Sequence, residues 1–486
     1  MYIQENTMAK LTNIIKQLSE KDYQAIYDSL IVSNADKSAF LLKALRDRNL
    51  ADGKVMLELD VNTNAYYTLR SRLNQKIEEY LLQQMESPRT DLLKKVANIN
   101  EVLFTKKKTI SIATIKKLEK ELLDYDLSNE LTMVYKALKK LHVHTPEHYE
   151  YSQLYNKHVA YMLAIDRAED ILSDYFKKFG IYSMTGDEVE RLGLTLLKNE
   201  IENVARLYES HRLFVYQSCI NIFHRLFVEG DEGLTDDEEP IEDILIKVNK
   251  IFATYEKDTI YYHFRLLFEF LRLEYYNYYK VYRKAEKYYQ DVNEAIGDLL
   301  TNYSWYTYPS QFLHTKIERC IRAGEQAYMH VENEMLFADF EADEDDMPKY
   351  IEYITYRAIS CHYADNYEEA SRWLNNLLNN VNLKKYPYAQ LEIKSILALE
   401  YAIMKEYDLF NQLISSIQRQ IRLMGKDHCE HVINFVKILK TAVNDTKRNK
   451  QHKIRAIFNK MKDHDRKHFS PTKYILFDEK LMAMIC

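Results

Sequence analysis

Apolar residues recur every three or four positions along most of this chain, a spacing that places them on one face of an α-helix. The clearest stripe lies within residues 63–84 and consists of Tyr66, Leu69, Leu73, Ile77, Tyr80 and Leu81. Asn62 or Thr63 can cap the start of this helix. Pro88 marks its end, because the residue before a proline avoids helical dihedral angles.

The same spacing predicts helix after helix through the first half of the chain. The predicted helices are 7–18, 20–32, 36–48, 51–59, 63–84, 92–105, 111–123, 129–141 and 146–179, followed by a helical stretch, 187–227, with at least one break. Gly180 is a suitable C-terminal stop for the helix that precedes it. We expect a helical N-terminal head in residues 1–88 and a helical array, made of degenerate repeats or of unrelated helices, in 89–229.

Three segments of the second half can be superimposed without a gap: 273–292, 358–377 and 398–417. In each, a tyrosine nine positions after the first residue opens a second helix. The tyrosines are Tyr282, Tyr367 and Tyr407, and the residues that must fit beside the first helix are Ala285, Ala370 and Phe410. The starting positions differ by 40 and 85 residues, so a further repeat is predicted around 309–334. Repetition at this period predicts stacked helical hairpins.

The repeats resemble the tetratricopeptide repeat, most closely at Ala358, Tyr367, Ala370, Leu374 and Leu377. They depart from it in their period of 40 residues rather than about 34, and Cys361 stands where the family has an aromatic residue. The chain also looks like large bacterial proteins in which a helical head precedes such an array. The resemblance implies an all-α, right-handed superhelix (an α-solenoid) over residues 244–486, in which a C-terminal helix caps the open end of the stack.

In such a superhelix the first helix of each hairpin lines an inner groove. The resemblance therefore implies a binding surface for a protein or peptide, with aromatic, acidic and amide groups suited to a positively charged segment. The implied peptide-binding residues are Phe270, Glu274, Asn277, Tyr278, Glu352, Thr355, Ile359, His362, Tyr363, Glu392 and Ser395. The alternative is that many of these side chains pack against neighbours or face water.

Composition supports a helical, non-secreted protein. The 486 residues include only 9 Gly and 7 Pro, against about 34 and about 24 at average usage, which argues against a fold rich in sheets and turns. The 40 Tyr suit packing between helices, because a tyrosine ring can be buried while its hydroxyl stays wet. Five scattered cysteines indicate free thiols in a reducing compartment, and no apolar run is long enough to cross a membrane. We expect a cytoplasmic protein; nothing indicates its oligomeric state.

Two acidic stretches, 230–243 and 332–348, are predicted to be solvated connections between hairpins. The alternative is a docking segment for a basic partner, which Phe337 and Phe340 within the second stretch favour.

No catalytic or cofactor motif is present: the chain has no Walker loop, no GxSxG and no HExxH. Histidines cluster at 142–148, at 428 and 431, and at 464 and 468, but such pairs arise by chance in charged helices. We therefore predict no catalytic residue, no cofactor and no metal site. An enzyme whose site is assembled from distant residues is a third hypothesis without a motif in its favour.

The competing function is transcriptional regulation by a helix-turn-helix-like head that binds DNA while the array senses a peptide. The residues that would contact DNA are Arg46, Arg48, Asn64, Tyr67, Arg70 and Arg72. The formal net charge of −6 gives no whole-protein case for nucleic-acid binding. The favoured interpretation is a non-enzymatic scaffold or adaptor that binds a protein or peptide.

Overall fold

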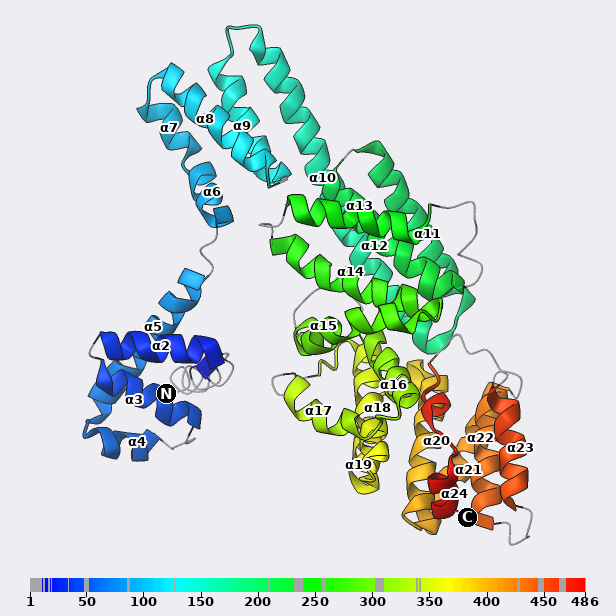
Figure 1. Cartoon of the computed structure of the whole chain (residues 1–486). Coiled ribbons are helices and arrows are strands. Elements are labelled where there is room, and N and C mark those ends of the chain that lie inside the picture. Colours follow the sequence, from blue (N-terminus) through cyan, green and yellow to red (C-terminus); the bar gives the residue numbers. More distant parts are fainter. Residues whose placement is uncertain are drawn as a thin grey trace. The chain divides into compact units, whose positions relative to one another are not determined.

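The protein is all-α in the computed structural model (Figure 1). The residues described are 11, 14–15, 18, 20–33, 35–47, 52–84, 88–125, 127–208, 210–230, 239–255, 259–301, 310–337, 340, 342–425, 429–444, 450–462 and 469–485, and among them there is no strand. The predicted helix 7–18 and the acidic residues 231–238 lie largely or wholly outside these ranges. The contacts divide the chain into two compact units, Met1–Tyr155 and Asn156–Cys486, a division that differs from the three predicted regions.

The first unit contains the predicted head and the helices that follow it. Its helices are α2 (Glu20–Val32), α3 (Asp36–Asp47), α4 (Asp52–Leu59), α5 (Thr63–Gln84), α6 (Pro88–Ala97), α7 (Ile99–Thr105), α8 (Lys108–Leu123) and α9 (Ser128–Leu141). Asn62 caps α5 as predicted, because its Oδ1 accepts a hydrogen bond from the backbone N of Ala65 at 2.8 Å. One apolar core joins the helices of the head, and a second joins α6 to α9.

The second unit begins within a long helix and continues through an aromatic core. Its first elements are α10 (Glu147–Thr185), α11 (Glu188–Leu207), α12 (His211–His224), a π-helical turn η1 (Arg225–Glu229) and α13 (Ile241–Thr254). The prediction that Gly180 ends its helix is wrong: α10 continues for five more residues, and Gly186, at φ 65°, follows its end. Tyr175 and Phe179 on α10 pack against Phe223 on α12 in the core. This packing stabilises α10 around Gly180, so the helix continues past the glycine.

Helical hairpins fill the rest of the second unit. The first helices are α14 (Thr259–Tyr278), α16 (Gln311–Ala323), α18 (Met347–Tyr363), α20 (Pro387–Ile403) and α22 (Glu430–Asn444); the second helices are α15 (Tyr282–Thr301), α17 (Tyr328–Leu336), α19 (Tyr367–Asn380), α21 (Tyr407–Met424) and α23 (Lys450–Lys462). Each first helix contacts the second helix that follows it. Tyr282, Tyr367 and Tyr407 open their helices as the sequence predicts.

One turn geometry joins the helices of the three aligned segments. The residue two before each tyrosine has left-handed backbone: Lys280 at φ 56°, Asp365 at φ 60° and Lys405 at φ 63°. The next backbone N–H bonds to the carbonyl five residues earlier: Val281 to Tyr276, Asn366 to Cys361 and Glu406 to Tyr401, at 2.8–2.9 Å. These are the bonds of a Schellman helix end, so the three segments share a backbone as well as a residue pattern.

The further repeat predicted around residues 309–334 corresponds to the hairpin of α16 and α17. Gly324 has φ 74°, and the backbone N of Glu325 bonds to the carbonyl of Cys320 at 2.9 Å, so this turn matches the other three. Superimposing the turns aligns 317–336 with the predicted repeats. Cys320 then occupies the same position as Cys361, and the buried Met329 occupies the position of Ala370.

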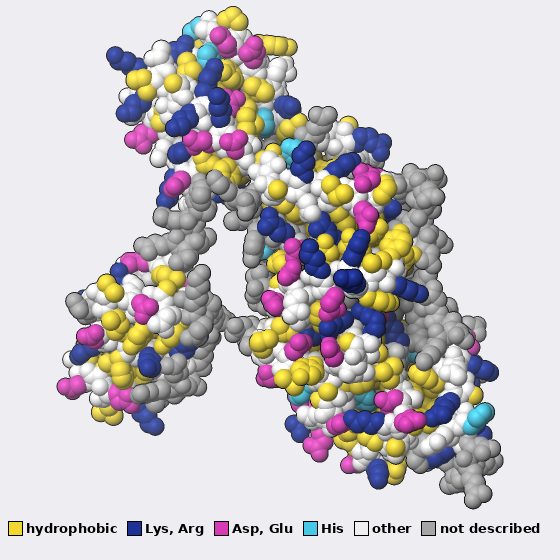
Figure 2. Space-filling view, viewed as in Figure 1, with side chains coloured by type: hydrophobic (Ala, Val, Ile, Leu, Met, Phe, Trp, Pro, Cys, Tyr) yellow, Lys and Arg dark blue, Asp and Glu magenta, His cyan; other side chains and the backbone are white. Residues whose placement is uncertain are grey.

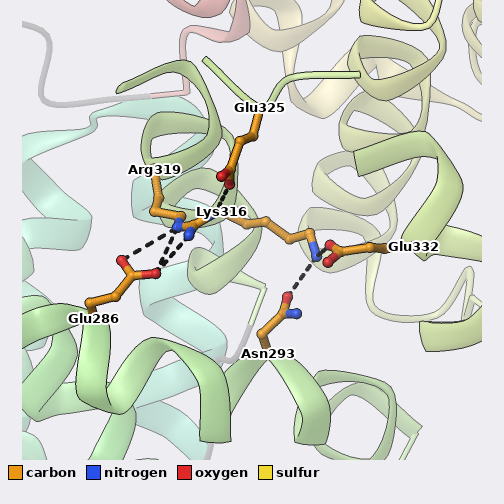
Figure 3. A network of polar contacts seen from close by, with 6 residues as sticks. All are labelled: Glu286, Asn293, Lys316, Arg319, Glu325 and Glu332. Atoms are coloured by element: carbon orange, nitrogen blue, oxygen red, sulfur yellow. Dashed lines mark hydrogen bonds and ion pairs between the residues drawn. The ribbon is translucent and has the colours of Figure 1, made fainter. Parts of the chain in front are cut away.

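A buried lysine on α16 forms hydrogen bonds to the preceding hairpin, α14–α15, and to α17 (Figure 3). The side chain of Lys316 on α16 is fully buried, and its Nζ donates to Asn293 Oδ1 of α15 at 2.6 Å and to Glu332 Oε2 of α17 at 2.5 Å. Arg319, one turn further along α16, pairs at the surface with Glu286 at 2.6 Å and also with Glu325. Burial lowers the pKa of Lys316, which the Glu332 carboxylate opposes.

The second acidic stretch faces the chain's own lysines. Residues 343–346 line a hollow of about 930 Å³ together with Lys177, Lys384 and Lys385. Phe337 is buried, and the ring centroid of Phe340 lies 4.7 Å from that of Tyr353, so both aromatic side chains pack within this unit. The two phenylalanines thus anchor this connection to the protein.

Replacing Lys316 tests how much its buried hydrogen bonds to Asn293 and Glu332 stabilise the fold. Lys316→Ala leaves Asn293 and the Glu332 carboxylate without their partner, and we expect it to lower the free energy of unfolding by about 2–4 kcal/mol. Lys316→Met, which keeps the volume of the side chain, should cost less. Arg319→Ala, which removes the more exposed ion pairs, should cost about 1 kcal/mol or less. Urea unfolding followed by circular dichroism measures the free energy of unfolding of all three variants. If Lys316→Ala is as stable as wild type, the buried contacts of Lys316 do not stabilise the fold.

Candidate peptide-binding site

The structure buries most of the predicted peptide-binding residues. Phe270 packs between the rings of Phe227 and Phe312 in the core. Ser395 is also buried, and its hydroxyl donates to the Leu391 carbonyl within its own helix at 2.8 Å. The buried members are Phe270, Glu352, Thr355, Ile359, His362, Glu392 and Ser395, whereas Glu274, Asn277, Tyr278 and Tyr363 are half-buried.

The chain's own C-terminus covers part of this surface. The C-terminal segment (residues 469–485) comprises a short turn, η5 (Pro471–Tyr474), an extended stretch and a last helix, α24 (Glu479–Ile485). It contacts α16, α20 and α22, beside which it is drawn in red in Figure 1. The segment therefore lies along several hairpins rather than only on the last one, where the capping prediction would place it. The side chains that contact the segment define the segment-binding face: His314, Glu318, Tyr363, Asp365, Glu392 and His431.

Glu392 on α20 holds the start of the segment. Its Oε2 accepts the backbone N–H of Thr472 at 3.2 Å and the Thr472 hydroxyl at 2.6 Å. Its Oε1 accepts the hydroxyls of Ser470 at 3.2 Å and of Tyr388 at 3.0 Å. A fully buried carboxylate is costly unless it is hydrogen-bonded, and here two of the four donors are hydroxyls from the C-terminal segment and a third is a segment backbone N–H.

His431 on α22 completes the contact with Thr472. Its Nε2 lies 2.5 Å from Thr472 Oγ1 and 4.0 Å from Glu392 Oε1. Since the threonine hydroxyl donates to Glu392, its oxygen accepts the proton on His431 Nε2. One threonine is thus recognised by side chains from two successive first helices.

Tyr363 at the end of α18 contacts the backbone of the segment. Its hydroxyl donates to the Tyr474 carbonyl and accepts the backbone N–H of Leu476 at 3.3 Å. Further along, Lys480 pairs with Asp365, the left-handed residue of the α18–α19 turn, at 2.6 Å. Polar groups of the α18–α19 hairpin therefore hold the middle and the end of the segment, whereas α20 and α22 hold its start.

His362, next to Tyr363, does not contact the segment. Its Nδ1 lies 2.8 Å from Glu400 Oε1, which joins α18 to α20. Burial opposes protonation of His362, but the Glu400 carboxylate outweighs it and raises the pKa of the imidazole. His362 thus fixes the spacing of two first helices.

Tyr474 lies over a cluster of groups that burial keeps uncharged. Burial raises the pKa of Glu352 and of Glu274 to about 8, even though Glu274 accepts a hydrogen bond from Thr315 at 2.6 Å. Burial also lowers the pKa of His314, whose Nε2 lies 3.7 Å from Glu352 Oε1, to about 3. At neutral pH these two predicted acidic groups therefore hold protons and offer hydrogen bonds rather than negative charge.

The predicted DNA-contacting residues do not form one exposed set. Arg46 donates to the Leu18 carbonyl at 2.9 Å and stacks on the Tyr23 ring, and Arg70 is buried beside Tyr66. Tyr67 and Arg72 are exposed, Arg48 lies outside the described residues, and the side chain of Asn64 is not described. On the face seen in Figure 2, basic and acidic side chains intermingle over the head.

Sequence reasoning found Tyr363 and Glu392 but missed what they bind. The available signal was the C-terminal run itself, in which the apolar Tyr474, Ile475 and Phe477 lie close together, before the helix that the structure forms there. Apolar residues in a non-helical stretch need a surface to cover them. These three are buried in the second unit.

The protonated state of Glu352 predicts a pH dependence of stability. The native state holds a proton that the unfolded chain, with a pKa near 4.5, releases, so the free energy of unfolding falls as pH rises from about 4.5 to 8. We expect Glu352→Gln to reduce this slope and to be about 1–2 kcal/mol more stable than wild type at pH 8. Urea unfolding at several pH values measures this. The exposed Glu334→Gln serves as control, and equal slopes in wild type and Glu352→Gln would contradict the prediction.

Every helix in the described part of the chain is too short or too polar to cross a membrane. Comparison with protein-family models, curated proteins and solved structures found no match to this chain. What its surface can bind must therefore be argued from its own geometry.

Proposed function

We propose that this protein is a non-enzymatic scaffold that binds an extended peptide of a partner protein on the segment-binding face. In this proposal the hairpins α14 to α23 form a superhelix that resembles tetratricopeptide arrays, and the first helices supply the binding groups. Its cysteines, of which Cys219, Cys320, Cys361 and Cys429 are buried free thiols, suit the reducing cytoplasm.

The single observation that carries the proposal is the binding of the C-terminal segment through its backbone. Tyr363 contacts a backbone carbonyl and a backbone N–H, and Glu392 accepts another backbone N–H. Every peptide has these groups, so the same face can hold a second extended chain once the segment leaves. Backbone contacts give affinity, and side-chain contacts select the sequence.

The side-chain contacts indicate which partner fits. Glu392 and His431 require a hydroxyl at the position of Thr472, and Asp365 favours a lysine at the position of Lys480. Between them the segment presents large apolar residues that join the cores of the second unit. The expected partner sequence therefore has Ser or Thr, then aromatic or branched apolar residues, then a basic residue.

The tethered segment competes with any partner. A segment joined to its own binding face has an effective concentration on the order of millimolar. A free peptide must therefore bind much more tightly than the tethered copy, or the tethered copy must be weakened. Weakening the segment within the full chain is the direct way to expose the face.

A peptide exchange experiment tests this proposal. A fluorescein-labelled peptide with the sequence of residues 469–485 is titrated with the full chain and with full-length Thr472→Val. Because the valine removes the hydroxyl that binds Glu392 and His431, we expect the peptide to bind the variant at least about 10-fold more tightly than wild type. Fluorescence anisotropy gives the dissociation constants.

Two controls separate release of the face from damage to the fold. A labelled peptide that itself carries Thr472→Val should bind the variant chain weakly, and Tyr363→Phe added to that chain should weaken binding of the unaltered peptide. Glu479→Gln, at an exposed position of the same segment, should leave the affinity near wild type. If a folded Thr472→Val chain binds the peptide no better than wild type, the segment is only a structural part of the fold and the proposal is wrong.

A further inference from the structure

Three potential metal ligands meet on three consecutive helices. They are His330 on α17, Cys361 on α18 and Glu369 on α19, and one donor atom from each lies within 4.8 Å of the other two. Cys361 Sγ lies 3.7 Å from His330 Nδ1. Cys361 is fully buried, whereas His330 and Glu369 are half-buried, so the cluster has an inner end and an outer end.

The spacing fits a tetrahedral zinc ion. Zinc bonds of about 2.3 Å to sulfur and about 2.0 Å to nitrogen, at a tetrahedral angle, place the two atoms about 3.5 Å apart. The observed separation of Sγ and Nδ1 is 3.7 Å. Glu369, at the start of α19, has a carboxylate oxygen within 4.8 Å of the donor atoms of both other residues.

The surroundings of the cluster fix the orientation of Glu369. Asn366 caps α19, with its Oδ1 accepting the backbone N–H of Glu369 at 3.3 Å. The Asn366 amide also donates to Glu369 Oε2 at 2.6 Å. Hydrogen bonds that hold a ligand carboxylate in place are a regular feature of metal sites.

The chemistry of the donors selects the ion. A thiolate and an imidazole favour zinc over magnesium or calcium, which prefer oxygen ligands. We propose that His330, Cys361 and Glu369 form a zinc-binding site, with a water molecule at the open outer position. Binding releases the thiol proton of Cys361, because zinc binds the thiolate.

Two of the three groups belong to the α18–α19 hairpin, and the third belongs to α17 of the preceding hairpin. A zinc ion at this point would join two successive hairpins, a function that does not depend on peptide binding.

Cobalt substitution tests the site in the full chain. Co²⁺ bound to a thiolate gives a charge-transfer absorption in the near ultraviolet that histidine or carboxylate sites elsewhere in the chain do not give. We expect one equivalent of Co²⁺ to produce this band under reducing conditions and one equivalent of Zn²⁺ to abolish it. Cys361→Ala should remove the band and lower the zinc affinity at least about 100-fold, and His330→Ala should weaken it.

Cys320→Ala is the matched control, because Cys320 is buried at the equivalent position of the preceding hairpin. It should keep the band. Thermal unfolding adds a second measurement: Zn²⁺ should raise the Tm of wild type and of Cys320→Ala, but not of Cys361→Ala. If wild type shows no thiolate band, or if Cys361→Ala binds zinc as wild type does, the three groups form only a thiol–imidazole hydrogen bond beside a carboxylate, and the proposal is wrong.

Discussion

One helix-ending turn sets the architecture of the second unit. Its 6→1 backbone hydrogen bond and left-handed residue recur at Lys280, Gly324, Asp365 and Lys405. The turn satisfies carbonyl groups at the end of each first helix and reverses the chain within a few residues. The same reversal brings the second helix of each of these hairpins back against its first.

The C-terminal segment bonds to side chains from three of these hairpins. Thr472 reaches Glu392 on α20 and His431 on α22, while Tyr363 at the end of α18 contacts the backbone two and four residues further on. Burial of these polar groups is stable only because each finds a partner across the interface. Burial also raises the pKa of Glu352 and of Glu274, which favours the uncharged forms of these two carboxyl groups.

The sequence predicted the helices well because apolar spacing determines which face of a helix is buried. It placed Tyr282, Tyr367 and Tyr407 at the starts of their helices, and it predicted the hairpin now seen at α16 and α17. It could not align that hairpin, because Met329 stands in the place of the small residue and the shared signal lies in the backbone. Only Gly324 among the four left-handed residues is a glycine, the residue type by which such turns are recognised. Gly180 failed as a stop because the aromatic core of α10 and α12 outweighs the low helix propensity of one glycine.

The candidate site was less accessible to sequence reasoning, because its two halves lie about a hundred residues apart in the chain. Tyr363 and Glu392 could be proposed from their places in the repeats, but nothing local links either of them to Thr472 or Tyr474. The cluster of His330, Cys361 and Glu369 was missed for the same reason, since its members come from three helices with no motif spacing.

Hydrogen exchange of the full chain, followed by mass spectrometry or nuclear magnetic resonance, tests most directly that the segment occupies its binding face. The account predicts that the amides of Thr472 and Leu476, which bond to Glu392 and Tyr363, exchange much more slowly than in a free peptide of the same sequence. It also predicts that Thr472→Val speeds this exchange while the amides of α18 stay protected. Exchange of residues 469–485 at free-peptide rates in the wild-type chain would contradict the account.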